Sequence, residues 1–142
     1  MIVVDDHHLL AALTRRAVGK PMSPTSELLA TTSSWYYRLA RAAHDAGFVG
    51  PLSRGIEGLP DTPRHDVLDM LDDLPVEIGL LPPRTLVPVM AKLSETVRLN
   101  HLAAEAVASA ILADASLLVV ASSELLAGAC ERFGIELTVA PV

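Results

Sequence analysis

The chain begins MIVVDDHHLLAAL, residues 1–13. Residues 1–4 form a short run of β-branched character, which favours a strand, and the apolar residues after position 8 recur at helical spacing. We therefore predict a strand, a short polar turn and a helix. Asp5 follows this strand directly, so the prediction places its carboxylate at the carboxyl end of the strand.

The rest of the chain alternates in the same way. Further strands are expected at 76–81, 117–120 and 135–139. Helices are expected over 28–43 (capped by Thr25 or Ser26), 63–74 (capped by Thr62), 85–99, 102–114 and 123–133, with a glycine-rich loop over 47–60. Continuous apolar strands between helices indicate a parallel sheet covered on both faces. The predicted fold is α/β, with three α/β/α layers, a short-stranded parallel sheet and more helix than strand.

Length and composition indicate one globular domain over residues 1–142. The chain is 51% hydrophobic, with a mean hydropathy of +0.40, so it can bury a core without a disulfide. Its single cysteine, Cys130, has no Cys or His at ligand spacing, which favours a core thiol in a reducing cytoplasm. No window approaches the ~18 consecutive apolar residues of a membrane span, so we expect a soluble protein.

The charge is acidic overall and uneven along the chain. The formal net charge is −6, which argues against strong nonspecific binding to nucleic acid, and nothing indicates recognition of DNA. Residues 1–58 hold six basic and five acidic side chains, whereas residues 59–142 hold five and twelve. A polyanionic partner would therefore meet the first part of the chain.

Two families place an acid directly after an initial strand. VVDDHHLL, followed by Thr14-Arg15-Arg16, resembles the start of a response-regulator receiver domain, in which paired acids bind magnesium beside a phosphoaccepting aspartate. A receiver also has that aspartate after its third strand and a late lysine before proline. In this chain the region where the phosphoaccepting aspartate would stand reads GFVGPLSRGIEG (47–58) and contains no aspartate. A Lys-Pro pair is also absent from this region and from the rest of the chain after it.

The second resemblance is to the PIN domain, the fold of many bacterial toxin ribonucleases of the VapC type. Its members begin with a strand ending in aspartate, as IVVD does at residues 2–5. They end with a helix, a hydrophobic strand, a helix and a last short strand. AAEAVASAILADASLLVVASSELLAGACERFGIELTV (103–139) resembles that half in length, order and small-residue content. The similarity covers both ends of the chain and is weak in the middle.

This resemblance implies a carboxylate cluster that binds Mg²⁺ or Mn²⁺ for RNA cleavage. Asp5 matches the first acid, and Glu105 matches the acid of the penultimate long helix with an offset of one residue. Asp5 would hold the cation, and Glu105 would ligate it or orient the attacking water. The resemblance implies two further acids, and this chain lacks both. Thr31 and Thr32 stand near the position of the acid expected in the second helix, and residues 120–122, where the other acid would follow the 117–120 strand, read Val-Ala-Ser.

The resulting functional expectation is a metal-dependent ribonuclease of the VapC toxin type with weakened or lost activity. The alternative is a non-catalytic RNA- or protein-binding module of PIN-like fold. The partners that these hypotheses imply are RNA, an antitoxin-like protein and a second copy of the chain. Both hypotheses require the opening strand and residues 117–120 to be parallel neighbours, so that Asp5 and Ser122 share one crevice.

Several polar residues have simpler structural interpretations. Asp5 could cap a helix, and we predict that Asp6 is the solvent-facing N-cap of the first helix. His7 and His8 diverge by roughly 100° on a helix, so either one joins Asp5 at a metal or both are exposed. Arg38 and Arg41 could contact RNA phosphates or form an ordinary exposed face. The acids Asp66, Asp69 and Asp73 are expected on a solvated helix face.

Overall fold

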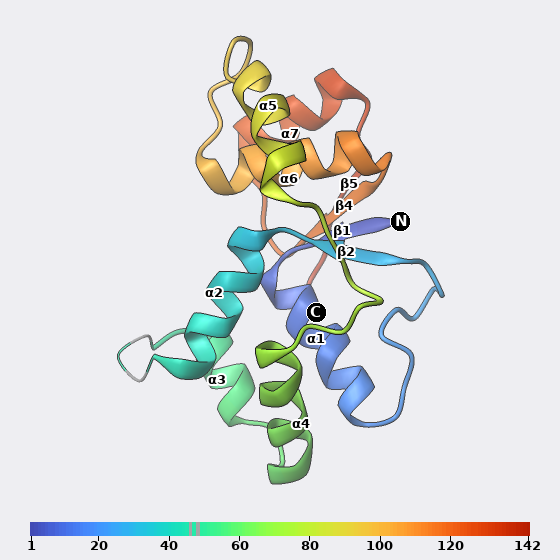
Figure 1. Ribbon diagram of the computed structural model, residues 1–142, viewed down its shortest axis with the longest axis vertical. Helices are drawn as coiled ribbons and strands as arrows, with labels where there is room; N and C mark the ends of the chain where they lie inside the picture. The colour runs from blue at the N-terminus through green and yellow to red at the C-terminus, as the bar shows by residue number, and fades with distance from the viewer. Residues whose placement is uncertain (46, 48) are drawn as a thin grey trace.

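The computed structural model describes residues 1–45, 47 and 49–142, so Ala46, next to the predicted loop over 47–60, and Phe48, within that loop, lie outside the described residues. In the described residues the chain forms five strands and seven helices (Figure 1). In chain order these are β1 (Ile2–Val4), α1 (Asp6–Ala17), β2 (Leu29–Thr31), α2 (Ser33–His44), α3 (Pro51–Glu57), α4 (Asp61–Asp72), β3 (Gly79–Leu80), α5 (Pro83–Leu93), α6 (His101–Ala113), β4 (Ser116–Val119), α7 (Glu124–Phe133) and β5 (Leu137–Val139).

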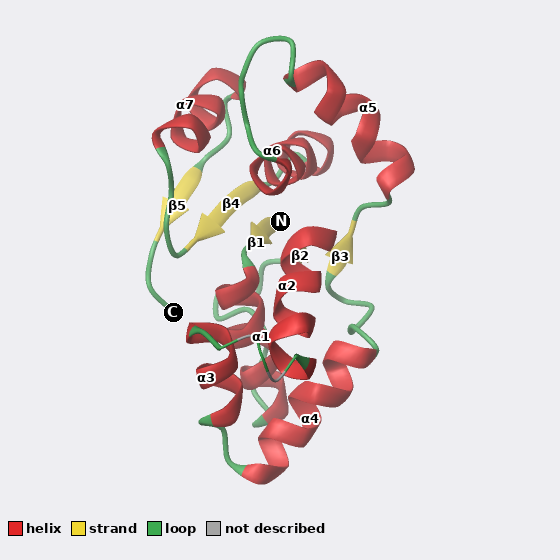
Figure 2. Ribbon diagram, turned by 90° about the vertical axis from the view of Figure 1, so that its left-hand side faces the viewer, coloured by secondary structure: helices red, strands yellow, loops and turns green. Residues whose placement is uncertain are grey.

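The five strands form one parallel sheet in the order β3-β2-β1-β4-β5. The opening strand β1 is therefore central, as Figure 2 shows. Val3 is in register with Leu117 of β4 on one side and with Ala30 of β2 on the other. The prediction that the opening strand and residues 117–120 are parallel neighbours is confirmed.

Helices cover both faces of the sheet, which confirms the predicted α/β class and three-layer arrangement. Successive residues of a strand point to opposite faces, so Val3 and Val4 enter different core clusters. Val3 and Leu117 pack with α5, α6 and α7, whereas Val4 and Leu29 pack with α1, α2, α3 and α4. Figure 1 shows these two helical groups on either side of the strands. None of the described helices combines the length and the apolar character needed to cross a membrane.

The second helix begins later than predicted. Residues 29–31 form β2, and the N-cap of α2 is Thr32, whose hydroxyl accepts a hydrogen bond from Trp35 N at 3.1 Å. The predicted helical spacing began at Leu28, but that side chain is 64% exposed. All three residues of β2 are buried, so this strand shows no polar alternation that would distinguish it from a helix.

Other segments also differ from the predictions. The helix predicted over 63–74 with Thr62 as its cap begins at Asp61 with Pro60 at the N-cap position, and the strand predicted over 76–81 is limited to Gly79–Leu80. The predicted loop over 47–60 contains α3, because Pro51 at its first position favours a helix and Leu52 and Ile56 bury one face. The predicted helix over 85–99 ends at Leu93. Its next residue, Ser94, donates from Oγ to Ala91 O at 2.6 Å, a local bond of the kind that competes with helix continuation.

Candidate functional site

A cavity of about 350 Å³ opens where β1 and β4 end. The turn from β1 into α1 forms one side, the segment between β4 and α7 forms another, and residues of α2 and the start of α6 complete it. Parallel sheets present ligand sites at this edge, because the loops after neighbouring strands converge there. Its polar lining residues are Asp5, Asp6, His7, Arg38, Asn100, Ser122 and Ser123.

Asp5 joins the two strand ends. One carboxylate oxygen accepts hydrogen bonds from His8 N at 2.9 Å and from His8 Nδ1 at 2.8 Å, and the other accepts from Val120 N at 2.7 Å. Asp5 is thus the N-cap of α1, and its residue is only 4% exposed. The structure places Asp5 in the shared crevice, as predicted, and gives it the capping role considered as the simpler interpretation.

The prediction that Asp6 is a solvent-facing N-cap is wrong. Because β1 runs into α1 with one residue between them, Asp5 takes the capping position and Asp6 becomes the first helical residue, 2% exposed. One Asp6 oxygen accepts from His7 N at 3.0 Å. The other, Oδ2, forms no hydrogen bond, although Arg38 Nη1 lies 3.3 Å away, within ion-pair distance.

These surroundings act on the Asp6 carboxyl in opposite directions. Burial raises its pKa and is the largest effect, and the neighbouring Asp5 carboxylate also raises it. The Arg38 guanidinium lowers the pKa, as does the His7 backbone N–H. Asp6 is therefore a buried acid whose charge is offset chiefly by an arginine that is itself 46% exposed at its side chain.

Glu105 is buried but faces a different cavity. Its carboxylate accepts from Ser33 N at 2.9 Å and Ser34 N at 3.2 Å, and Ser34 Oγ donates to it as well. Glu105 therefore accepts from backbone N–H groups that would otherwise lack a partner at the start of α2, and its negative charge stabilises the positive end of that helix dipole. The cavity it lines, of about 300 Å³, also includes Tyr37, Met90 and His101. Asp5 and Glu105, predicted to act together, line separate cavities.

The other predicted polar residues divide between the cavity and the surface. Arg38, Ser122 and His7 line the cavity, whereas Arg41 is exposed and pairs with Asp45 at 3.4 Å. His8 belongs to α1 and its side chain is 10% exposed, so the interpretation of two exposed histidines is wrong. The acids at 66, 69 and 73 are exposed on the α4 side of the molecule, as expected for a solvated face.

Asn100 was not predicted as a site residue, but it lines the cavity and caps α6, accepting from Ala103 N at 2.8 Å. The signal for this cap was present, since asparagine directly before a helical apolar pattern is a preferred N-cap. Ser123 caps α7 in the same way, accepting from Leu126 N at 3.1 Å.

The cavity offers two carboxylates as possible oxygen donors to a cation. Mg²⁺ favours oxygen ligands and is often bound through one or two carboxylates while it keeps several waters. Asp5 and Asp6 supply two carboxylates, but the Asp5 oxygens are engaged and Arg38 stands beside Asp6. Within residues 1–45, 47 and 49–142, no group of three or more His, Cys, Asp or Glu side chains is arranged to hold a metal.

Neither models of known protein families nor curated protein sequences give a match to the chain. The chemistry of the cavity follows from its own residues. It combines two buried acids with a guanidinium, and two serines and an asparagine stand at helix N-termini or next to one. In such a group of side chains, Arg38 can bind a phosphate, and the two carboxylates can attract a hydrated cation to the same cavity.

Proposed function

We propose that the protein is a PIN-like domain of metal-dependent ribonuclease descent, which engages RNA at the cavity beyond β1 and β4 and whose cleavage activity is weakened or lost. One observation carries the proposal. Asp5 ends the central strand and binds Val120 N at the end of the neighbouring strand, so the first acid of the resemblance borders a polar cavity. The closing order α6-β4-α7-β5 also agrees with the resemblance.

In this proposal Arg38 contacts an RNA phosphate. Its guanidinium has five N–H donors, and its contact with Asp6 engages Nη1, which leaves donors for phosphate oxygens. Asp6 and Asp5 would hold Mg²⁺ or Mn²⁺, and such an ion, when bound, activates water and stabilises negative charge on the phosphate. Because Arg38 competes for Asp6, we expect the ion to bind weakly.

A second function, a non-catalytic RNA- or protein-binding module, is favoured by the hydrogen bonds of the two predicted catalytic acids. Asp5 accepts three hydrogen bonds that hold α1 and β4, and Glu105 accepts three at the start of α2. Both acids therefore stabilise the fold, which would favour their retention in the sequence after loss of catalysis. In this case RNA or a protein would bind without being cleaved.

The two functions are separated by measuring binding and cleavage of labelled single-stranded RNA in parallel, with Mn²⁺ or with EDTA. The informative variant is Asp6→Asn, which keeps the shape of the side chain and removes the charge. Cleavage that requires Mn²⁺ and is lost in Asp6→Asn would support the ribonuclease. Binding without cleavage in either protein would show that cleavage activity is absent, and the domain would then act as the binding module.

Arg38→Gln and Arg41→Gln form a matched pair for the binding arm. Both arginines lie on α2 and both changes remove one positive charge, but only Arg38 lines the cavity. We expect Arg38→Gln to weaken RNA binding by about tenfold and Arg41→Gln to weaken it much less. Equal effects of the two variants would show that RNA meets only the general charge of the surface, and absence of both binding and cleavage would refute both functions.

A further inference from the structure

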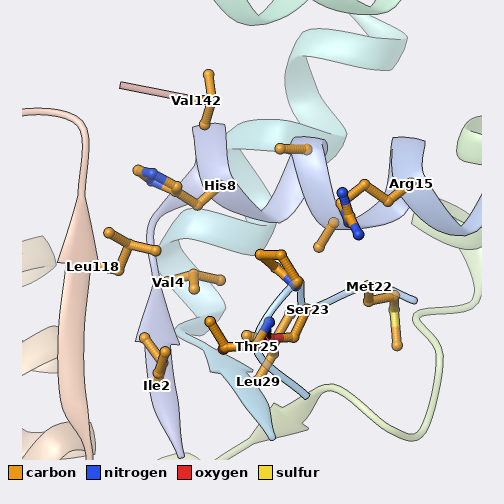
Figure 3. Close-up of a pocket in the computed structure, with 13 residues that line it drawn as sticks. Ile2, Val4, His8, Arg15, Met22, Ser23, Thr25, Leu29, Leu118 and Val142 are labelled. Carbon is orange, nitrogen blue, oxygen red and sulfur yellow. Dashed lines mark hydrogen bonds between the residues drawn. The ribbon is translucent and has the colours of Figure 1, made fainter. Parts of the chain in front are cut away.

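A second cavity, of about 210 Å³, lies between α1 and the face of the sheet formed by β2, β1 and β4 (Figure 3). Its floor is formed by apolar side chains of three strands, among them Val4, Leu29 and Leu118. The segment 22–25, which leads toward β2, forms a wall through Met22. The cavity shares no lining residue with the one beyond β1 and β4, so an inference about it does not depend on the proposed function.

Two polar side chains of α1 border this apolar space. His8 and Arg15 are seven residues apart, about two helical turns or roughly 10 Å along the axis, and Figure 3 shows them toward opposite ends of the helix segment that covers the cavity. The His8 side chain is nine-tenths buried. Its Nδ1 lies 2.8 Å from an Asp5 carboxylate oxygen, which can only accept, so Nδ1 carries the proton. Nε2 has no partner among the described residues and, in the neutral ring, is an acceptor.

Arg15 is held in position without an acidic partner. Its Nε donates to Pro21 O at 2.8 Å, which fixes the guanidinium beside segment 22–25. No ion pair joins Arg15 to an acid in the described part of the chain, so its terminal N–H groups are available. None of the residues lining the cavity is Asp or Glu. The cavity is therefore largely apolar, and Arg15 is the one Lys, Arg, Asp or Glu among its lining residues, which also include Val142; this favours an anion that carries an apolar body.

We propose that this cavity binds a small aromatic or short aliphatic monocarboxylate. The carboxylate pairs with the Arg15 guanidinium, the body lies on Val4, Leu29 and Leu118, and a hydroxyl at the far end donates to His8 Nε2. The size is appropriate, since an apolar cavity of about 150 Å³ accommodates benzene, and this cavity is somewhat larger. Arg15 suits the head group because a guanidinium matches a carboxylate in shape as well as charge.

The test uses the full chain, with benzoate, 4-hydroxybenzoate and uncharged benzyl alcohol as probes. Binding is followed by changes in backbone amide NMR signals during titration to millimolar concentration. We expect benzoate to shift the amides of Ala11, Met22 and Leu29, and 4-hydroxybenzoate to bind more tightly than benzoate. Benzyl alcohol should bind at least about tenfold more weakly than benzoate, because it lacks the charge that Arg15 recognises.

Three variants locate the site. Arg15→Gln should weaken benzoate binding about tenfold and leave benzyl alcohol unchanged, whereas Arg16→Gln, the matched control on the same helix, should change neither. Arg16 instead pairs with Glu77 at 2.8 Å and does not line the cavity. Ala11→Leu should abolish binding of all three probes by filling the space. Equal weakening by Arg15→Gln and Arg16→Gln, or amide shifts that do not map to the cavity, would overturn the proposal.

Discussion

Replacement of Asp5 by alanine tests whether its carboxylate holds the molecule together at the sheet edge. The substitution removes the acceptor for three donors at once: His8 N at the start of α1, the His8 ring and Val120 N at the end of β4. Asp5 and Val120 are 115 residues apart in the chain. We therefore expect Asp5→Ala to destabilise the contact between the β1–α1 turn and β4.

The expected magnitude follows from the individual contacts. Loss of an N-cap side chain costs about 1 kcal/mol. Leaving the half-buried Val120 N–H without its acceptor costs about 1–2 kcal/mol, and loss of the ring contact with His8 costs about 1 kcal/mol more. The free energy of unfolding should fall by about 3 kcal/mol. Since domains of this size are usually stable by about 5–15 kcal/mol, the variant should remain folded.

Urea denaturation followed by circular dichroism measures this difference. Ser123→Ala is a suitable control, because Ser123 is also an N-cap but its cap rests on one hydrogen bond, from Leu126 N. This control should lose only about 1 kcal/mol. If Asp5→Ala loses no more than Ser123→Ala, the bonds to His8 Nδ1 and Val120 N contribute nothing, and the structural role assigned to Asp5 is refuted.

Three further predictions concern other buried groups. Glu105→Gln should lower the free energy of unfolding by about 1–3 kcal/mol in urea denaturation, because a buried charged acceptor at the start of α2 is lost, whereas Glu124→Gln, an exposed change in the first turn of α7, should cost less than about 1 kcal/mol; equal values would contradict the assigned contact. Burial raises the pKa of Asp6 in the folded protein above its ordinary value of 3.8, so this acid destabilises the fold once pH rises above that value. Asp6→Asn should therefore raise the melting temperature relative to the parent at neutral pH and change it little near about pH 3.5, and an unchanged difference across this range would contradict the assigned burial. Burial also raises the pKa of the Cys130 thiol, so a thiol reagent should modify it slowly in buffer and rapidly in urea; rapid modification in buffer would show an accessible thiol.

The two ends of the chain could be predicted because their patterns are locally consistent. The run at 117–120 is continuous, apolar and of strand length, and the helix before it has a stripe of small and apolar residues. The parallel sheet followed from the alternation of strands and helices, whereas the pairing of β1 with β4 was a condition that the functional hypotheses required. β2 and α3 could not be predicted in the same way, since each is short and its burial is decided by neighbours distant in the chain.

The site was harder to predict than the fold, and Asp6 shows why. Adjacent aspartates after a strand are equivalent in sequence, but only one can take the N-cap position. The end of β1 at Val4 gives that position to Asp5 and buries Asp6. Glu105 presents a related difficulty, because its partner Ser33 is 72 residues away and its inward direction depends on where α2 begins.

The measurement that tests the central claim most directly is a titration with paramagnetic Mn²⁺ followed by broadening of backbone amide signals. We predict broadening at Asp6, Arg38 and Ser122, half-complete at millimolar Mn²⁺, and its loss in Asp6→Asn. Broadening confined to the exposed acids at 66, 69 and 73, with none beyond β1 and β4, would contradict a cation site of ribonuclease descent at the sheet edge.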